Sequence, residues 1–144
     1  MTDKVFVDSN IWLYALTIPR DGEDMSKRNK AVKCLRNLAD QKTIVVSIQV
    51  INEFHWNMLR KFKINDDSVA EIVKVNVESI AVITEIGYPV YRKAFNLRKK
   101  YSLSFWDSLI VASALESECE MLYTEDLQHG QVLESRLTLC NPFL

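Results

Sequence analysis

Glycine is scarce in this chain of 144 residues, which contains only Gly22, Gly87 and Gly130. No two of these glycines lie close together in the sequence. The P-loop and the GxGxxG dinucleotide-binding turn both need several glycines within one short loop. A nucleotide cofactor held by such a loop is therefore not expected.

Cysteine and histidine are also rare. The cysteines Cys34, Cys119 and Cys140 are scattered and form no CxxC pair, and the histidines are His55 and His129. A structural zinc site draws on four such ligands at short spacings, so none is expected here. The scatter and the odd number indicate reduced thiols, packed inside a cytoplasmic protein.

Long apolar runs and an excess of one charge are absent too. The N-terminal apolar run is broken by Asp8, which argues against a signal peptide, and no run is long enough to span a bilayer. Basic residues number 18 and acidic residues 19, which argues against a uniformly basic nucleic-acid surface but allows a local basic patch. With 48% apolar residues, we expect one globular domain over residues 1–144.

Short apolar strands alternate with helical patterns along the chain. Strands are expected at residues 4–7, 43–47, 80–83, 121–124 and 137–140. Helices are expected at residues 9–16, 25–39, 48–62 with Ser47 as N-cap, 65–77, 89–100 and 102–118, and residues 17–24 are expected to form an exposed loop. This alternation predicts an α/β fold with a mostly parallel, helix-flanked sheet. Ligands of such sheets bind at the carboxyl ends of the strands.

Four acidic residues are expected to meet at that edge of the sheet. Asp8 follows the first strand, and Asp126 follows the fourth strand by two residues. Glu53 lies in the second turn of the helix after the second strand, and Asp107 lies in the first turn of a late helix. Carboxylates repel one another and converge in folded proteins mainly around a cation. Ligand sets made only of oxygen favour Mg²⁺ or Mn²⁺ over zinc.

Each acid also has an ordinary structural interpretation. Asp8 is a good N-cap for the helix that begins at the next residue, and Asp107 stands three residues after Ser104, as in a capping box. A single Glu53 is commonly a solvated helix residue, and Asp126 is commonly a turn residue. The combination of the four, and no single acid, indicates a site.

Four short motifs carry a resemblance to a known family. They are FVDSNIWLYA near the N-terminus, VINEF in the middle, SFWDSLIVASAL late in the chain and LYTEDLQHG near the end. In this order they resemble the PIN-domain ribonucleases, and among those the VapC-like toxins of toxin–antitoxin pairs. The resemblance implies a three-layer α/β/α fold, dependence on Mg²⁺ or Mn²⁺, cleavage of single-stranded RNA, an antitoxin partner and a homodimer.

The resemblance also assigns roles to individual residues. It puts the catalytic and metal-binding acids at Asp8, Glu53, Asp107 and Asp126, with Asn10 and Thr124 as supporting polar residues. Glu125 and Asp126 are adjacent, and either can face the metal. Asp126 is preferred because it fits the Thr-x-Asp pattern of the family.

A basic segment precedes the late helix. It is interleaved with aromatic residues and contains Arg92, Lys93, Arg98, Lys99 and Lys100. One interpretation is contact with the RNA backbone, and the other is a solvated helix face with its apolar residues turned inward.

Three alternatives remain open at this point, namely a nuclease without the toxin role and two rival functions. In a phosphatase of the haloacid-dehalogenase type, an Asp that ends the first strand is the nucleophile. That chemistry usually has a second acid two residues later, where this chain has Asn10, and no clear catalytic lysine motif follows the middle strands. The other rival is a non-catalytic RNA- or protein-binding domain that keeps the same fold.

Overall fold

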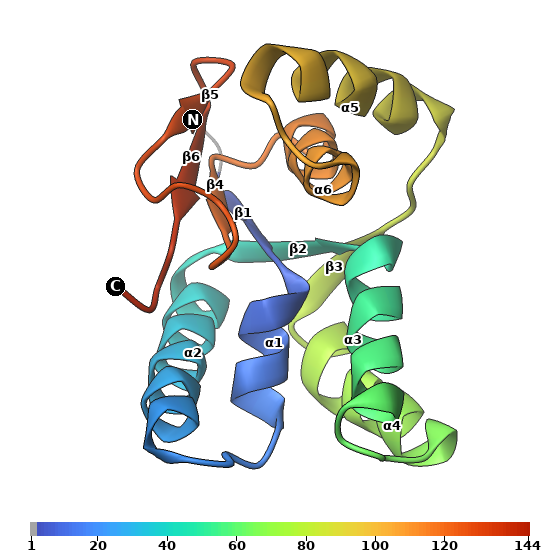
Figure 1. Ribbon diagram of the computed structural model, residues 1–144, viewed down its shortest axis with the longest axis vertical. Helices are drawn as coiled ribbons and strands as arrows, with labels where there is room; N and C mark the ends of the chain where they lie inside the picture. The colour runs from blue at the N-terminus through green and yellow to red at the C-terminus, as the bar shows by residue number, and fades with distance from the viewer. Residues whose placement is uncertain (1–2) are drawn as a thin grey trace.

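A six-stranded sheet forms the centre of the computed structural model, which describes residues 3–144 (Figure 1). Its strand order is β3-β2-β1-β4-β6-β5. All neighbouring strands are parallel except β5, which is antiparallel to β6. The strands are β1 (Lys4–Val7), β2 (Thr43–Ser47), β3 (Ala81–Thr84), β4 (Met121–Tyr123), β5 (Val132–Leu133) and β6 (Leu137–Cys140).

Helices cover both faces of this sheet. Helices α1 to α4 lie on one side and α5 and α6 on the other, which confirms the predicted three-layer α/β/α fold (Figure 1). The helices are α1 (Ser9–Leu16), α2 (Gly22–Gln41), α3 (Ile48–Arg60), α4 (Asp66–Ile72) with a π-helical continuation (Val73–Glu78), α5 (Tyr88–Tyr101) and α6 (Phe105–Glu116).

The chain reverses its direction of travel across the sheet at β1. From β1 it moves outward to β2 and β3, and it then returns through α5 and α6 to β4 on the other side of β1. The carboxyl ends of β1 and β4 are therefore neighbours at the point where the strand order reverses, which is where open α/β sheets bind ligands. The backbone N–H of Asp8 donates to the carbonyl of Tyr123 at 3.0 Å, so both strands end at the same level.

The core is built around β1 and α6. Val5, Phe6 and Val7 have no exposed surface, as expected for a central strand that is covered on both faces. Residues 108–115 of α6 are all buried, so this helix is embedded along most of its length. Within residues 3–144, no helix is both long enough and apolar enough to cross a membrane.

Two helix boundaries differ from the predictions because of local capping. Helix α2 begins at Gly22 and not at residue 25, since the carboxylate of Asp21 accepts a hydrogen bond from the N–H of Asp24 at 2.8 Å. Part of the predicted loop at residues 17–24 is therefore helical. Helix α6 begins at Phe105 and not at residue 102, because Ser102 adopts a left-handed conformation that ends α5.

Three further features of the fold differ in detail from the predictions. Strand β5 was not expected, since two residues are too short to show an alternating pattern, and the predicted fifth strand is β6. The helix expected to reach Val77 changes to π-helical hydrogen bonding after Ile72. Ser47 occupies the N-cap position of α3, but its side chain makes no capping hydrogen bond.

Shortening one buried side chain of β4 tests how much this strand stabilises the fold. Leu122 is fully buried, so Leu122→Ala should lower the free energy of unfolding by about 2–5 kcal/mol through lost burial and the cavity left behind. Leu144 is 82% exposed, and Leu144→Ala should change that free energy by less than about 0.5 kcal/mol. Urea denaturation of both variants measures the difference, and equal losses would contradict this description of the core.

Candidate active site

Asp8 is a buried carboxylate at the end of β1, with 5% of its surface exposed. Its Oδ1 atom accepts a hydrogen bond from the N–H of Ser9 at 2.7 Å, and its Oδ2 atom accepts one from the Thr124 hydroxyl at 2.9 Å. The two sequence interpretations of Asp8 are therefore compatible, since one oxygen caps α1 while the other faces the end of β4. Burial raises the pKa of Asp8 to about 6, although both hydrogen bonds lower it.

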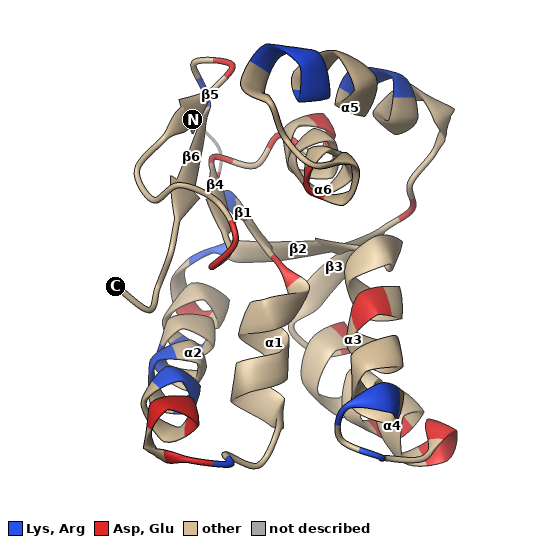
Figure 2. Ribbon diagram, viewed as in Figure 1, with Lys and Arg blue, Asp and Glu red and all other residues tan. Residues whose placement is uncertain are grey.

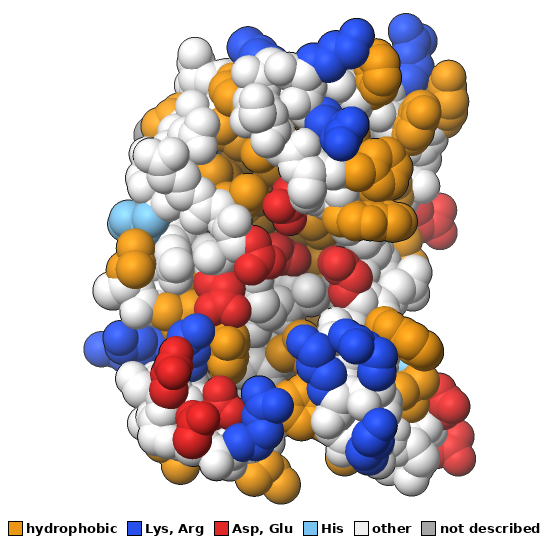
Figure 3. Space-filling view, in the orientation of Figure 1, with side chains coloured by type: hydrophobic (Ala, Val, Ile, Leu, Met, Phe, Trp, Pro, Cys, Tyr) orange, Lys and Arg blue, Asp and Glu red, His pale blue; other side chains and the backbone are white. Residues whose placement is uncertain are grey.

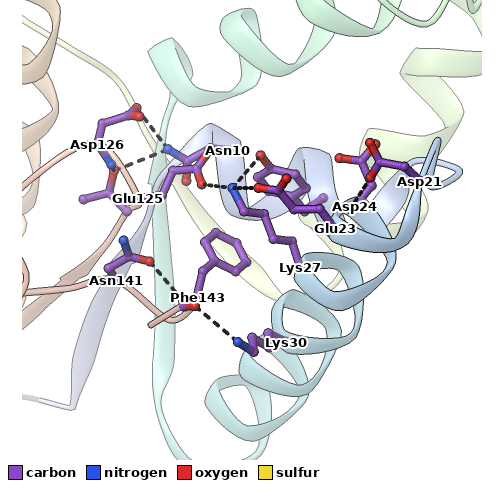
Figure 4. A network of polar contacts seen from close by, with 12 residues as sticks. Asn10, Asp21, Glu23, Asp24, Lys27, Lys30, Glu125, Asp126, Asn141 and Phe143 are labelled. Carbon is purple, nitrogen blue, oxygen red and sulfur yellow. Dashed lines mark hydrogen bonds and ion pairs between the residues drawn. The ribbon is translucent and has the colours of Figure 1, made fainter.

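Asn10 and Thr124 join Asp8 to Asp126. Figure 4 shows Asn10 directed at Asp126. The Thr124 hydroxyl accepts a hydrogen bond from the N–H of Asp126 at 3.2 Å. The amide nitrogen of Asn10 donates to Asp126 Oδ2 at 3.0 Å and to Thr124 Oγ1 at 3.4 Å. These two residues, expected to support the site, thus fix the position of one acid relative to another across β1 and β4.

Glu125 is held apart from this arrangement by Lys27. Its Oε2 atom lies 3.0 Å from Lys27 Nζ, which also donates to the Tyr14 hydroxyl at 3.2 Å (Figure 4). The hydrogen bond that Lys27 donates to Glu125 is the main cause of the raised pKa of Lys27. The geometry therefore favours Asp126 over Glu125 as the acid that faces the site. The sequence carries no signal for this role of Lys27, which lies 98 positions from Glu125.

Glu53 and Asp107 approach the same place from α3 and α6. Burial, followed by the charge of Asp8, raises the pKa of Glu53 to about 7. The N–H of Asp107 donates to the Ser104 hydroxyl at 3.1 Å, as expected for a helix cap. The charge of Asp107 raises the pKa of each of the other three acids, so all four carboxyl groups lie within electrostatic reach of one another. Figure 2 shows acidic residues at the end of β1, on α3 and after β4.

Buried polar atoms without partners gather at the same edge of the sheet. Among the described residues 3–144, four side-chain atoms are buried without a hydrogen-bond partner, namely Asn10 Oδ1, Ser47 Oγ, Gln49 Oε1 and Glu53 Oε1. All four belong to the end of β2 or to the first two turns of the helices that follow β1 and β2. Such atoms are uncommon in native proteins, and their concentration here indicates a site that contacts something further. Gln49 was not singled out from the sequence, although it lies one helical turn before Glu53.

These donors fit a hard divalent cation by their chemistry. The four acids offer only oxygen atoms, and Glu53 Oε1 is buried with no other partner. In the described part of the chain, however, no three acidic, histidine or cysteine side chains stand ready to hold one ion together. The carboxylates are thus near one another but do not form a ready three-ligand set among the described residues.

The basic residues of α5 are partly engaged in ion pairs. Lys100 Nζ lies 2.7 Å from Glu134 Oε2, and Lys93 Nζ lies 3.8 Å from Glu116 Oε2. Lys99 lies over the ring of Phe95, while Arg92 and Arg98 are exposed. Figure 3 shows Lys and Arg side chains over α5 on one side of a central acidic hollow, and over the region of α2 and α3 on the other side. RNA contact by α5 stays a prediction.

The family follows from a match that extends over most of the chain. Residues 5–132 match the family model of the PIN domain. The chain belongs to the PIN domain family. The match includes Asp8, Glu53, Asp107 and Asp126 and therefore the whole acidic site. No curated protein sequence matches this PIN domain.

Solved structures share the fold of this PIN domain at low sequence identity. VapC20 of Mycobacterium tuberculosis, described as a sarcin–ricin loop cleaving toxin, is 15% identical over 85% of this chain and 91% of its own, with a TM-score of 0.62. VapBC2 of Rickettsia felis, bound to promoter DNA, is 16% identical over 96% of this chain and 99% of its own, with a TM-score of 0.69. A toxin–antitoxin complex of Klebsiella pneumoniae is 19% identical over 96% of this chain and 97% of its own, with a TM-score of 0.67.

Replacing Glu53 tests whether its ionised carboxylate destabilises the metal-free protein. The folded pKa of about 7 lies above the ordinary 4.5, so the folded protein binds this proton more tightly and loses stability as pH rises between these values. In EDTA at pH 8.5, Glu53→Gln should raise the melting temperature by about 2–4 °C, a value that allows for partial exposure. At pH 5 the gain should largely disappear.

The matched control for this measurement is Glu71→Gln, which changes an exposed acid on α4. Calorimetry in EDTA at both pH values should show no comparable gain for this variant. A lower melting temperature for Glu53→Gln than for wild type at pH 8.5 would show that the charge is already compensated.

Proposed function

We propose that this PIN domain is a Mg²⁺- or Mn²⁺-dependent endoribonuclease that hydrolyses phosphodiester bonds of single-stranded RNA, as the cytoplasmic toxin of a toxin–antitoxin pair. The observation that carries the proposal is the convergence of four carboxyl groups from distant parts of the chain, with raised pKa values at Asp8, Glu53 and Asp126. A fold does not define an activity, and the argument therefore rests on this site. The phosphatase alternative usually has a second acid two residues after Asp8. That position is Asn10 in this chain, and its amide donates a hydrogen bond to Asp126.

The side chains divide into groups that hold an ion and groups that position them. Asp8 and Asp107 would be the principal ligands, since one is fixed at the end of β1 and the other at the start of α6. Asp126, directed by Asn10, would complete the acidic cluster. When bound, Mg²⁺ or Mn²⁺ lowers the pKa of a coordinated water and offsets negative charge on the phosphate.

Glu53 is suited to accept a proton during hydrolysis. Its Oε1 atom is buried without a partner, and its pKa is raised to about 7. A carboxylate oxygen without a partner is free to accept a proton, and a bound cation would lower the pKa of Glu53 from its value in the metal-free protein. In this proposal Glu53 takes the proton of the attacking water. A hydrogen bond with the Gln49 side chain lowers the pKa of Glu53 and so limits the rise caused by burial.

An antitoxin protein and a second copy of the chain are the proposed partners. The Klebsiella structure and VapBC2 are described as a toxin–antitoxin complex and as a complex on promoter DNA, respectively. A further similar structure, FitAB bound to the IR36 DNA fragment, is 16% identical over 97% of this chain, with a TM-score of 0.68. These descriptions support an antitoxin partner, whereas the homodimer rests on the family resemblance.

Asp8→Asn tests the proposed reaction. With Mg²⁺ or Mn²⁺, the wild-type protein should cleave unstructured RNA, EDTA should abolish cleavage, and Asp8→Asn should lower the rate at least about 100-fold, because a charged ligand and its fixed position are lost. The control is Asp40→Asn, which makes the same chemical change at an exposed residue of α2 just before the amino end of β2. Equal rates for Asp8→Asn and wild type would refute the proposal.

The adjacent acids after β4 should differ sharply in their contribution. Asp126→Asn should lower the cleavage rate by about 10-fold or more, as expected when an acid near a metal is removed. Glu125→Gln removes the ion pair with Lys27 and should lower the melting temperature while changing the cleavage rate less than about threefold. Gel-based cleavage assays and thermal melts measure both effects. The reverse order of the two rates would assign the site to Glu125.

A further inference from the structure

An open hollow of about 460 Å³ adjoins the acidic site on the side of Glu53. It is bordered by Trp56 and Trp106 as well as by Gln49 and Glu53. Its volume lies within the roughly 300–1,000 Å³ that is typical of small-molecule sites. Glu53 lines this hollow and belongs to the acidic cluster, so the two are continuous. Figure 3 shows hydrophobic side chains next to the acidic ones, between α6 and α3.

The two tryptophans that border the hollow are unusually exposed. Trp56 is 60% exposed and Trp106 is 63% exposed, although both carry large apolar rings. Each of the two tryptophans lies close to one of the acids along the same helix. Trp106 directly precedes Asp107, and Trp56 follows Glu53 by three residues on the same face of α3. Two flat rings therefore stand within one helical turn of the carboxylates.

Gln49 supplies a polar atom without a partner in the wall of the same hollow. Only 8% of this residue is exposed, and its amide nitrogen donates to the carbonyl of Trp106 at 3.3 Å. Its Oε1 atom is buried and has no hydrogen-bond partner. This bond fixes the amide, so the free oxygen is available as an acceptor for the N–H of a ligand in the hollow.

We propose that this hollow is a subsite for one unpaired nucleobase of the RNA, which stacks on Trp106 and donates an N–H to Gln49 Oε1. The inference rests on the proposed function and deepens it, because it names the groups that read the substrate beside the acidic cluster. Bases of single-stranded nucleic acids commonly stack on exposed aromatic rings. An unpaired base also offers the N–H groups of its Watson–Crick edge, which duplex RNA does not.

The mixed character of the hollow favours a base over an apolar protein surface. A buried amide oxygen and a carboxylate in its wall would lose solvation without compensation under a purely apolar partner. A nucleobase matches both features, since its faces are apolar and its edge carries N–H donors. Continuity with Glu53 puts the phosphate that adjoins this base next to the carboxylates.

A double-mutant comparison with abasic RNA tests the stacking. Fluorescence anisotropy measures the binding of a fluorescein-labelled RNA hexamer under two conditions that prevent cleavage. One uses the Asp8→Asn background with Mg²⁺, and the other uses the otherwise wild-type chain in EDTA. An abasic site is moved through the six positions. At one position, loss of the base should weaken binding roughly 10-fold when Trp106 is present and less than about twofold in Trp106→Leu. Trp106→Phe keeps a ring and should stay within about threefold of Trp106.

Gln49→Leu tests the hydrogen bond separately. At the position that couples to Trp106, it should reduce the difference in affinity among the four bases by roughly threefold or more. A merely structural role of Gln49 would lower the affinity for all four bases equally. Equal losses would therefore remove Gln49 from the subsite.

The measurements also separate this inference from its alternatives. If an abasic site weakens RNA binding by the same factor in the Trp106 protein and in Trp106→Leu, the subsite is refuted. If light scattering then shows that Trp106→Leu lowers the molecular mass, the face is an interface between copies of the chain. If base-dependent coupling persists but the wild-type chain cuts no RNA with either metal, the proposed function fails while the subsite stands.

Discussion

The buried carboxylate of Asp8 is the constraint on which the rest of the site depends. Its two oxygens are shared between the start of α1 and the end of β4, through Ser9 and Thr124. This sharing joins the two central strands where the strand order reverses, so the position of the acid is set by the sheet itself. A rigid strand end defines a charged group more precisely than a mobile loop does.

Among residues 3–144, several polar groups around Asp8 are buried without a hydrogen-bond partner or an opposite charge. Glu53 and Gln49 each bury an oxygen that finds no partner in the described residues, and Glu53 has a pKa raised to about 7. Such groups reduce stability in the metal-free chain, and they persist at sites where a ligand compensates them. The ion pair of Lys27 with Glu125 has the opposite effect, because it neutralises an acid that directly precedes Asp126. The distribution of paired and unpaired charges thus distinguishes the site from the surrounding surface.

The sequence predicted the central strands and the family well because both depend on short local patterns. Apolar runs such as residues 4–7 and 43–47 gave the central strands, and the motifs around Asp8 and Asp107 gave the family. Local capping by Asp21 and the left-handed Ser102 shifted two helix starts, and no periodic pattern encodes them. The two-residue strand β5 forms only because β6 pairs with it. The contacts of Lys27 and the free oxygen of Gln49 depend on packing between distant segments, so only the structure shows them.

The central claim is that the cluster organised by Asp8 binds a divalent cation. Titration of the protein with Mn²⁺, followed by electron paramagnetic resonance of the free ion, tests this claim without reference to RNA. We predict that the wild-type chain binds Mn²⁺ and that Asp8→Asn abolishes or strongly weakens this binding, while Asp40→Asn leaves it unchanged. If wild type and Asp8→Asn take up Mn²⁺ equally, or if neither binds it, the account of the site is contradicted.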